Sequence, residues 1–327
     1  MARALPLLPV IAALLVAGAA AACGAAGTGG DVTRGTPATT RSGGHRATTP
    51  PATLCGPLEA TVTGRVQTPE ATELSGLVAS PGQRGVLWTH NDSGDRPRIF
   101  AIAADGSLLA DLDVPGAEAV DWEDIALGPD PGHPGGRALY LGDIGDNRSA
   151  RPAVDVYRVP EPRVATPGAT GATAPAVRLR LHYPDGPHDA ETLLVDPRTG
   201  ELAIVTKQLS GESGVYVVRS PPADGGERTL RLVARLHLGL GGLATGGDVS
   251  ADGRVVAVRT YTGFVAWRKR PRASLAATLQ RTPCHGRTSF PGERQGEALA
   301  LDRHGVSFLT VPEGAGATIR RYAATRR

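Results

Sequence analysis

Acidic residues recur along the chain, each at the head of a short run of small and apolar residues. Their separations are 50, 68, 57 and 49 residues, so five similar segments follow one another. Carboxylate oxygens are ligands that divalent cations prefer, and carboxylates that converge on one axis repel each other unless something neutralises them. The acids that lead the five segments are Glu73, Glu123, Glu191, Asp248 and Glu297.

Two further segments are dense in oxygen-bearing side chains. The run NDSGD contributes Asn91 and Asp92, and the run DIGDN contributes Asp143. Ca²⁺ takes about six to eight oxygen ligands, whereas Zn²⁺ would require more His or Cys than these segments offer. We therefore predict a Ca²⁺ site among these residues and the leading acids. The alternative is a purely structural network in which the acids cap backbone N–H groups or pair with cations.

Three other side chains are candidates for catalysis. Lys207 and Arg259 follow apolar runs in the third and fourth segments, and cations opposite carboxylates and a metal suit an anionic oxygen ligand. Internal salt bridges would use the same residues. His90, next to Asn91, is a candidate general base, with ordinary hydrogen bonding as the alternative.

The elements that must position these residues are short strands. Each acid-led run is followed by a turn and a second apolar run, such as GVLWTHND at 85–92, a pattern typical of hairpins. A third run follows, and in most segments a fourth, which in the fourth segment would be 275–281. Four antiparallel strands repeated at about 45 to 60 residues indicate the blades of a β-propeller. We predict an all-β fold of five blades, or six if the long second segment divides.

Propeller geometry would bring the candidate residues together. The first strand of a blade lines the central axis and the second runs back antiparallel to it. The start of the first strand and the end of the second therefore lie on the same face. We expect the acids, the two oxygen-dense segments and the cations to surround one end of the axis.

The two ends of the propeller are expected to join. The fifth segment stops after its third strand, while residues 60–66, ATVTGRV, form a strand ahead of the first segment that would complete the fifth blade. A ring left open would expose unpaired edges. Cys55 precedes this strand and Cys284 follows the outer strand of the fourth segment, so we predict a disulfide between them.

The N-terminal region resembles an export signal. Residues 1–22 carry Arg3, an apolar run too short to span a bilayer and a small-residue stretch. The sequence Ala20-Ala21-Ala22-Cys23-Gly24 favours lipidation of Cys23, with simple cleavage after Ala-x-Ala as the alternative. Residues 23–54 lack large apolar side chains and are expected to form a disordered tether to a domain at 55–327. The protein would thus be extracytoplasmic and anchored to the membrane only by its lipid, or else secreted.

Charge and motifs exclude several classes of function. The 35 basic and 32 acidic residues give a net charge of only +3, which does not favour a nucleic-acid partner. No GxSxG, P-loop, GxGxxG or HExxH motif is present. A small anionic ligand or an envelope protein remains as the expected partner, bound by a monomer.

The acid-led runs ELSGLV, DWEDIAL, DAETLLV and QGEALAL resemble those of secreted phytase-like and esterase-like propeller proteins. More distantly they resemble the gluconolactonase and regucalcin group. The resemblance implies a divalent cation bound through Glu73, Glu123, Asp143, Asp248 and Glu297. Two functions follow as hypotheses: a metal-dependent hydrolase of phosphoesters, esters or lactones, and a non-catalytic module that binds a ligand or protein at the same face.

Overall fold

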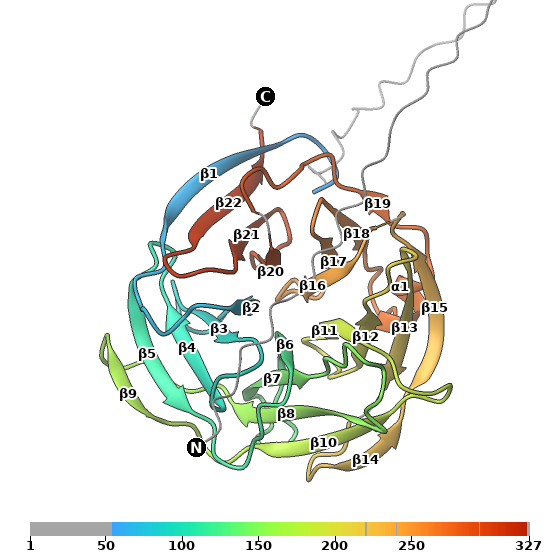
Figure 1. Ribbon diagram of the computed structural model, residues 1–327, viewed down its shortest axis with the longest axis horizontal. Coiled ribbons are helices and arrows are strands. Elements are labelled where there is room, and N and C mark those ends of the chain that lie inside the picture. The colour runs from blue at the N-terminus through green and yellow to red at the C-terminus, as the bar shows by residue number, and fades with distance from the viewer. Residues whose placement is uncertain (1–53, 220, 240, 294, 326–327) are drawn as a thin grey trace, which may run out of the picture. The chain divides into compact units, whose positions relative to one another are not determined.

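The computed structural model describes residues 54–325 except 220, 240 and 294. The predicted signal peptide, Cys23 and nearly all of the tether lie outside these residues. The described residues form five mainly antiparallel sheets arranged in a ring, which confirms the five-bladed propeller (Figure 1). No helix among them is long and apolar enough to cross a membrane.

The innermost strand of each blade lines the central axis. Each of these strands contacts the innermost strand of both neighbouring blades, which closes the ring. In chain order they are β2 (Leu74–Ala79), β6 (Trp122–Pro129), β11 (Ala190–Val195), β16 (Ala244–Val249) and β20 (Gly296–Leu301).

Two strands follow outward in each blade. In blades one to five these are β3 (Leu87–Asn91) and β4 (Arg98–Ile102), β7 (Arg137–Asp143) and β8 (Val154–Pro160), β12 (Leu202–Thr206) and β13 (Glu212–Val218), β17 (Val255–Thr260) and β18 (Phe264–Arg268), and β21 (Ser307–Pro312) and β22 (Thr318–Ala324). The fourth strands are β5 (Leu108–Asp113), β10 (Val177–His182), β15 (Arg231–His237), β19 (Cys284–His285) and β1 (Leu58–Arg65).

Burial explains the composition of the strands. The inner strand β11 and its neighbour β12 are buried at every position, because blades pack on both of their faces. In the outer strand β15 most positions are partly or fully exposed to solvent. Aromatic side chains fill the space between blades: Trp88, Trp122 and Tyr157 belong to one core between blades one and two. Blade-to-blade packing is therefore the main use of the large apolar residues.

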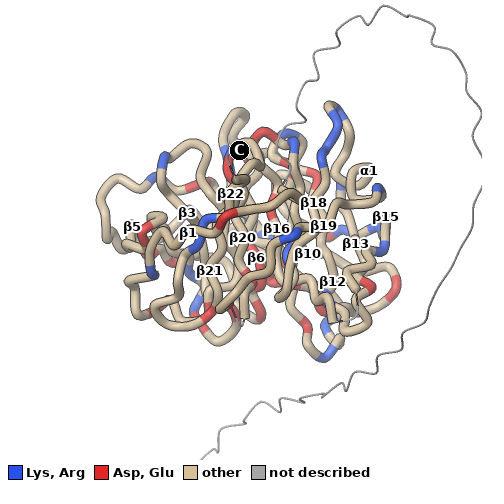
Figure 2. The backbone as a smooth tube through the Cα atoms, turned by 90° about the horizontal axis from the view of Figure 1, so that it is seen from above, with Lys and Arg blue, Asp and Glu red and all other residues tan. Residues whose placement is uncertain are grey.

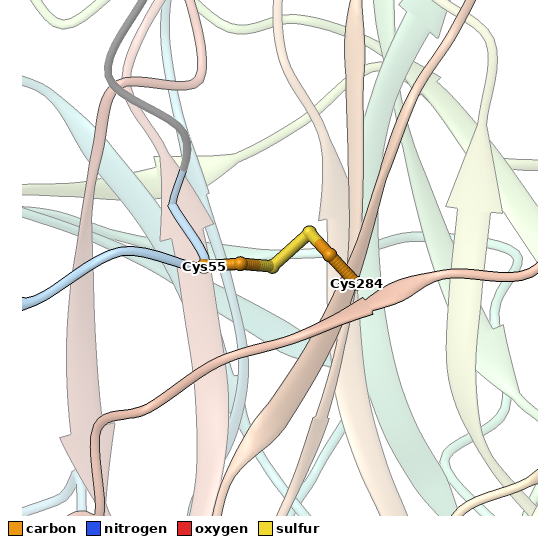
Figure 3. The surroundings of a disulfide bond; sticks show 2 residues. All are labelled: Cys55 and Cys284. Atoms are coloured by element: carbon orange, nitrogen blue, oxygen red, sulfur yellow. A yellow bond between two sulfur atoms is a disulfide. The ribbon is translucent and has the colours of Figure 1, made fainter. Parts of the chain in front are cut away.

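The two ends of the propeller meet in blade five. Strand β1 pairs antiparallel with β22, from Leu58 opposite Ala324 to Arg65 opposite Thr318, and becomes the outermost strand of that blade. The predicted disulfide between Cys55 and Cys284 is confirmed, with a Cα–Cα distance of 6.0 Å (Figure 3). It joins the residues just before β1 to the outer strand of blade four.

Two insertions add strands to the outer edges of neighbouring blades. Strand β9 (Ala169–Ala172), from the Pro- and Ala-rich insertion of blade two, pairs parallel with β5 of blade one. Strand β14 (Gly226–Thr229), from blade three, pairs parallel with β10 of blade two. Each insertion therefore covers an edge that would otherwise expose unpaired backbone groups.

The fourth strand predicted at 275–281 is wrong. That segment begins as helix α1 (Leu275–Leu279), and β19 supplies the outer strand of blade four instead. Ser274 caps the helix by accepting a hydrogen bond from the backbone N–H of Ala277. Leu and Ala are strong helix formers, and the Glu201 carboxylate accepts hydrogen bonds from the N–H groups of Leu275 and Ala276.

Candidate functional site

The pairing between the first and second strands is irregular at the same place in every blade. The register shifts around the second residue of the inner strand, as at Glu123, which lies between the paired residues Trp122 and Asp124. Such a bulge leaves the extra residue unpaired and changes the direction of its side chain. The five equivalent residues are Ser75, Glu123, Glu191, Thr245 and Glu297.

Three carboxylates from blades one and two converge beside this ring of bulges. One oxygen from each of Asp92, Asp121 and Glu123 lies within 4.8 Å of the other two. Asp92 directly follows β3, Asp121 directly precedes β6, and Glu123 is the bulged residue of β6. This group is the strongest candidate for a metal site among the described residues.

A glycine forms one wall of the group. Gly145 belongs to the DIGDN segment, and its backbone N–H donates to the carbonyl oxygen of Asp121. A Cβ atom at Gly145 would lie 2.5 Å from Cγ of Asp121 and would also collide with the Glu123 carboxylate. The space next to these two carboxylates therefore exists because residue 145 has no side chain.

Burial and mutual repulsion make the three carboxylates difficult to ionise together. Burial, followed by the charges of Asp92 and Asp121, raises the pKa of Glu123 well above its usual range. Burial also raises the pKa of Asp92 to about 7, with the charges of Asp121, Glu313 and Glu73 adding to the effect. A bound cation would reverse this trend because it favours the ionised form of each ligand.

The opposite side of the axis carries one cation among further acids. Lys207 pairs with Glu191 through Nζ and lies over the ring of Tyr261, 5.6 Å from its centroid. The hydroxyl of Tyr261 donates to Oε1 of Glu297 at 3.1 Å. Burial and the neighbouring Glu313 raise the pKa of Glu297 to about 8. Oε2 of Glu191 and Oε2 of Glu297 have no hydrogen-bond partner among the described residues.

We call these residues the axial acidic site. All five blades contribute to it, and blade four does so through Tyr261, which directly follows β17. The site comprises Asp92, Asp121, Glu123, Glu191, Lys207, Tyr261, Glu297 and Glu313.

Asp143 was predicted to bind the metal directly, but it supports the backbone beneath the site. Its Oδ1 accepts the N–H of Asp121 at 3.1 Å and its Oδ2 accepts the N–H of Val120 at 3.4 Å. Arg151 donates from Nη1 to Asp143 at 2.8 Å and to the carbonyl of Gly145 at 2.8 Å. Asp143 and Arg151 thus fix the segments that carry Asp121 and Gly145.

Asn91 and Glu73 also differ from the prediction. The Asn91 side chain accepts from the N–H groups of Thr72 and Glu73, and it donates to the carbonyl of Glu70 and to Asp95. Its oxygen and nitrogen are therefore committed to the turn before β2. Glu73 contributes its carbonyl oxygen to the N–H of Asp92, while its side chain is exposed and outside the three-carboxylate group.

Asp248 is not equivalent to the other leading acids. It is the fifth residue of β16, so it lies about 10 Å further along the axis than the bulged residues. Its oxygens accept the N–H groups of Val249 and Leu301. Asp124, which was not predicted as a site residue, has a similar role: it accepts the N–H groups of Leu193 and Gly247 from blades three and four. Asp248 thus links the inner strands of blades four and five, and Asp124 links that of blade two to those of blades three and four.

His90 and Arg259 are too deeply buried for the catalytic roles predicted for them. His90 is 0% exposed, its Nδ1 lies 2.8 Å from the carbonyl oxygen of Asn91, and burial lowers its pKa to about 4. The Arg259 guanidinium is also 0% exposed and pairs with Glu293 at 2.6 Å. In the strand register Arg259 lies opposite Gly246 of β16, so it lies before the end of its own strand. Tyr261, which follows that strand, occupies the position equivalent to that of Lys207.

The fold and the site define a five-bladed propeller with an acidic group at one end of its axis. No family model matches the sequence, and no curated protein sequence matches it. Among solved structures, the chain is similar to a gluconolactonase from Xanthomonas campestris, with a TM-score of 0.44 and 16% identity, over 83% of this chain and 91% of the other. It is also similar to Sqt1 from Chaetomium thermophilum, with a TM-score of 0.35 and 15% identity, over 77% of this chain and 60% of the other. The blade assignment here rests on strand pairing alone.

Proposed function

We propose that the axial acidic site binds a divalent cation, Ca²⁺ by its ligand chemistry, and that the protein is a metal-dependent hydrolase of an ester, phosphoester or lactone. One observation carries the proposal: Asp92, Asp121 and Glu123 bring three carboxylates within 4.8 Å of one another, with Glu123 buried and the two aspartates half-buried. All three ligands are hard oxygen donors, which Ca²⁺ prefers, and neither Cys nor His belongs to the group.

The surrounding residues fit such an ion. Gly145 leaves space beside Asp121 and Glu123, and across the axis the Oε2 atoms of Glu191 and Glu297, which have no hydrogen-bond partner among the described residues, are further acceptors. Arg151 and Asp143 hold the backbone of the Asp121 segment in place. A bound cation would polarise a substrate oxygen and make a coordinated water more acidic.

Lys207 is the residue best placed to stabilise negative charge on the substrate. Its ammonium group is held by Glu191 and the Tyr261 ring on the side of the axis opposite the three carboxylates. A fixed positive charge there would stabilise negative charge that develops on a substrate during hydrolysis. It would also favour a small anionic ligand over a cationic one.

A non-catalytic binding module is the second candidate. The burial of His90 and Arg259 favours this function, because these two of the three predicted catalytic side chains are not free to contact a ligand at the axis. In this case the same site would bind a cation together with a small anion or an envelope protein and would catalyse nothing.

The disulfide between Cys55 and Cys284 indicates an oxidising, extracytoplasmic compartment. We further propose that residues 1–22 are removed on export, that Cys23 carries a lipid and that residues 23–54 tether a monomeric propeller to the membrane. Mass spectrometry of the membrane fraction would test this, with a diacylglyceryl mass on Cys23 as the expected result and an N-terminal peptide that lacks this mass as the contrary one.

The function is tested by assaying the protein against a panel of model phosphoesters, esters and lactones, with and without Ca²⁺. Glu123→Gln should abolish any Ca²⁺-dependent turnover while the fold persists, because it removes one charged ligand. Glu118→Gln, at an exposed position close in sequence, is the matched control and should leave turnover unchanged. Calcium binding without turnover of any substrate class would support the binding module instead.

A further inference from the structure

A second feature of the surface is a stretch of the chain that is rich in basic residues. Between residues 253 and 292 the chain contains no Asp or Glu, although it contains eight Lys and Arg residues. Six of these residues are exposed arginines, namely Arg254, Arg268, Arg270, Arg272, Arg281 and Arg287. The small net charge of the whole chain therefore conceals a separation of acidic and basic regions.

Part of this basic region forms a cavity of about 280 Å³ between β15 of blade three and the segment from α1 to β19 of blade four. Its charged and titratable lining residues are Arg235, His237, Arg281 and His285, and its described lining contains no carboxylate. Figure 2 shows Lys and Arg positions in blue along this side of the molecule, near the labels of β15 and β18. We call this the basic cavity.

The four side chains are accessible. The Arg235 side chain is 54% exposed and that of His237 is 79% exposed, and both make only distant contacts of 3.6 and 3.8 Å with Glu212. Arg281 donates from Nη1 to the carbonyl oxygen of Arg268, which fixes its position without neutralising its charge. The remaining lining is apolar and includes Leu236, Leu238, Leu279 and Pro283.

We propose that the basic cavity and the exposed arginines next to it bind the headgroups of an anionic phospholipid surface. A cluster of about four to eight Lys and Arg residues is typical of surfaces that attract anionic lipids. The lining of the cavity combines cations with leucines. A lipid, which has an anionic headgroup and an apolar chain, therefore matches this lining better than a fully hydrated anion does.

The place of Cys55, at the start of the propeller, supports this partner. Cys55 is bonded to Cys284, the residue next to His285 of the basic cavity. The 54 residues that precede Cys55 therefore join the propeller beside this surface. Attraction between the basic cavity and an anionic membrane would therefore add to any membrane attachment that the N-terminal segment provides.

The full chain carrying Cys23→Ser, which cannot be lipidated, tests the proposal in a vesicle sedimentation assay. It should bind vesicles of phosphatidylglycerol and phosphatidylcholine in equal parts, and should not bind vesicles of phosphatidylcholine alone. Binding should be largely lost at about 0.5 M NaCl, because exposed charges are then screened within a few ångströms.

Charge-removing variants locate the binding surface. The triple variant Arg235→Gln, Arg281→Gln and His285→Gln should weaken binding by about twentyfold or more, at roughly fivefold for each arginine near an anionic surface. The control is Arg84→Gln, Arg148→Gln and Arg163→Gln, three exposed arginines in blades one and two, and it should change binding less than about threefold.

Three results would overturn the proposal. The first is equal binding to both kinds of vesicle, and the second is an equal loss of binding in the two triple variants. The third is binding of inorganic phosphate, measured by calorimetry, without binding of the anionic vesicles, which would assign the cavity to a soluble anion. None of these results depends on a cation at the axial site.

Discussion

Gly145 lies so close to Glu123 that no side chain could stand between them. A Cβ atom at residue 145 would collide with the carboxylate of Glu123 and with that of Asp121. The glycine comes from the connection after β7, while both acids flank Trp122 at the start of β6. A backbone segment thus approaches the candidate ligands closely enough to define the space that an ion would occupy.

The first prediction follows from this contact. Gly145→Ala should weaken Ca²⁺ binding by about tenfold or more, because the methyl group would displace the ends of the Asp121 and Glu123 side chains. The protein should still fold, since Gly145 does not have a positive φ and those side chains can move. Isothermal titration calorimetry measures the effect. Gly82→Ala, where the nearest side-chain atom is 4.0 Å from the added Cβ, is the control, and equal affinities of the two variants would contradict the prediction.

The second prediction concerns pH. Burial raises the pKa of Asp92 to about 7 in the folded protein, above its ordinary value of 3.8. Between these two pH values the folded state binds a proton that the unfolded state has lost, so stability without Ca²⁺ should fall as the pH rises through this window. Ca²⁺ binds the ionised carboxylates, so the increase in Tm on adding Ca²⁺ should be larger at about pH 8 than at about pH 5. Calorimetric melting at both pH values checks this, and a larger increase at the lower pH would contradict it.

The third prediction concerns Asp124. This buried carboxylate accepts hydrogen bonds from the backbone N–H groups of Leu193 and Gly247, so it ties blade two to blades three and four. Asp124→Ala should lower the free energy of unfolding by roughly 2 to 4 kcal/mol, because it leaves buried donors unpaired. Denaturant unfolding measures this loss. Asp224→Ala, at an exposed position, should have almost no effect, and a similarly small loss for Asp124→Ala would refute the linking role.

The fourth prediction concerns the closure of the ring. The bond between Cys55 and Cys284 joins residues 229 positions apart and lies next to β1, the outermost strand of blade five. Reduction, or the double substitution Cys55→Ser and Cys284→Ser, should destabilise the protein by roughly 2 to 5 kcal/mol. The Tm with and without reductant tests this. If the two values coincide, the disulfide does not contribute to holding β1 in place.

The sequence was sufficient to predict the five blades because the inner strands repeat the same pattern of an acid followed by small and apolar residues. The disulfide could be predicted from the positions of Cys55 and Cys284 relative to the predicted strands. The helix α1 was not predicted, although Ser274 and the Leu and Ala residues after it favour a helix; the Glu201 carboxylate of blade three adds hydrogen bonds to its N-terminus that the sequence does not reveal.

The site was predicted only in part, because the alignment of the segments was wrong in blades one and four. In blade one Glu73 was taken as the leading acid, although Ser75 is the residue at the bulge. Asp248 was taken as a leading acid, although Thr245 is the residue at the bulge. The same shift led to Arg259 instead of Tyr261. A fixed offset from the end of the second strand would have found Tyr261 and Glu313, since both follow that strand directly, as Asp92 and Lys207 do.

The adjacent residues Asn91 and Asp92 illustrate a different difficulty. Asn91 and Asp92 are adjacent and both carry side-chain oxygen, yet only Asp92 belongs to the three-carboxylate group. The Asn91 side chain is held by backbone groups of the turn at Thr72 and Glu73. Sequence spacing alone cannot distinguish a ligand from a turn-capping residue when both functions use the same atoms.

Metal binding by the purified protein tests the central claim most directly. We predict that elemental analysis after dialysis against Ca²⁺ finds about one ion per chain, that EDTA removes it and lowers the Tm, and that Glu123→Gln abolishes binding while Glu118→Gln does not. A protein that retains no Ca²⁺ and melts at the same temperature with and without EDTA would contradict the proposal that the axial acidic site is a metal site.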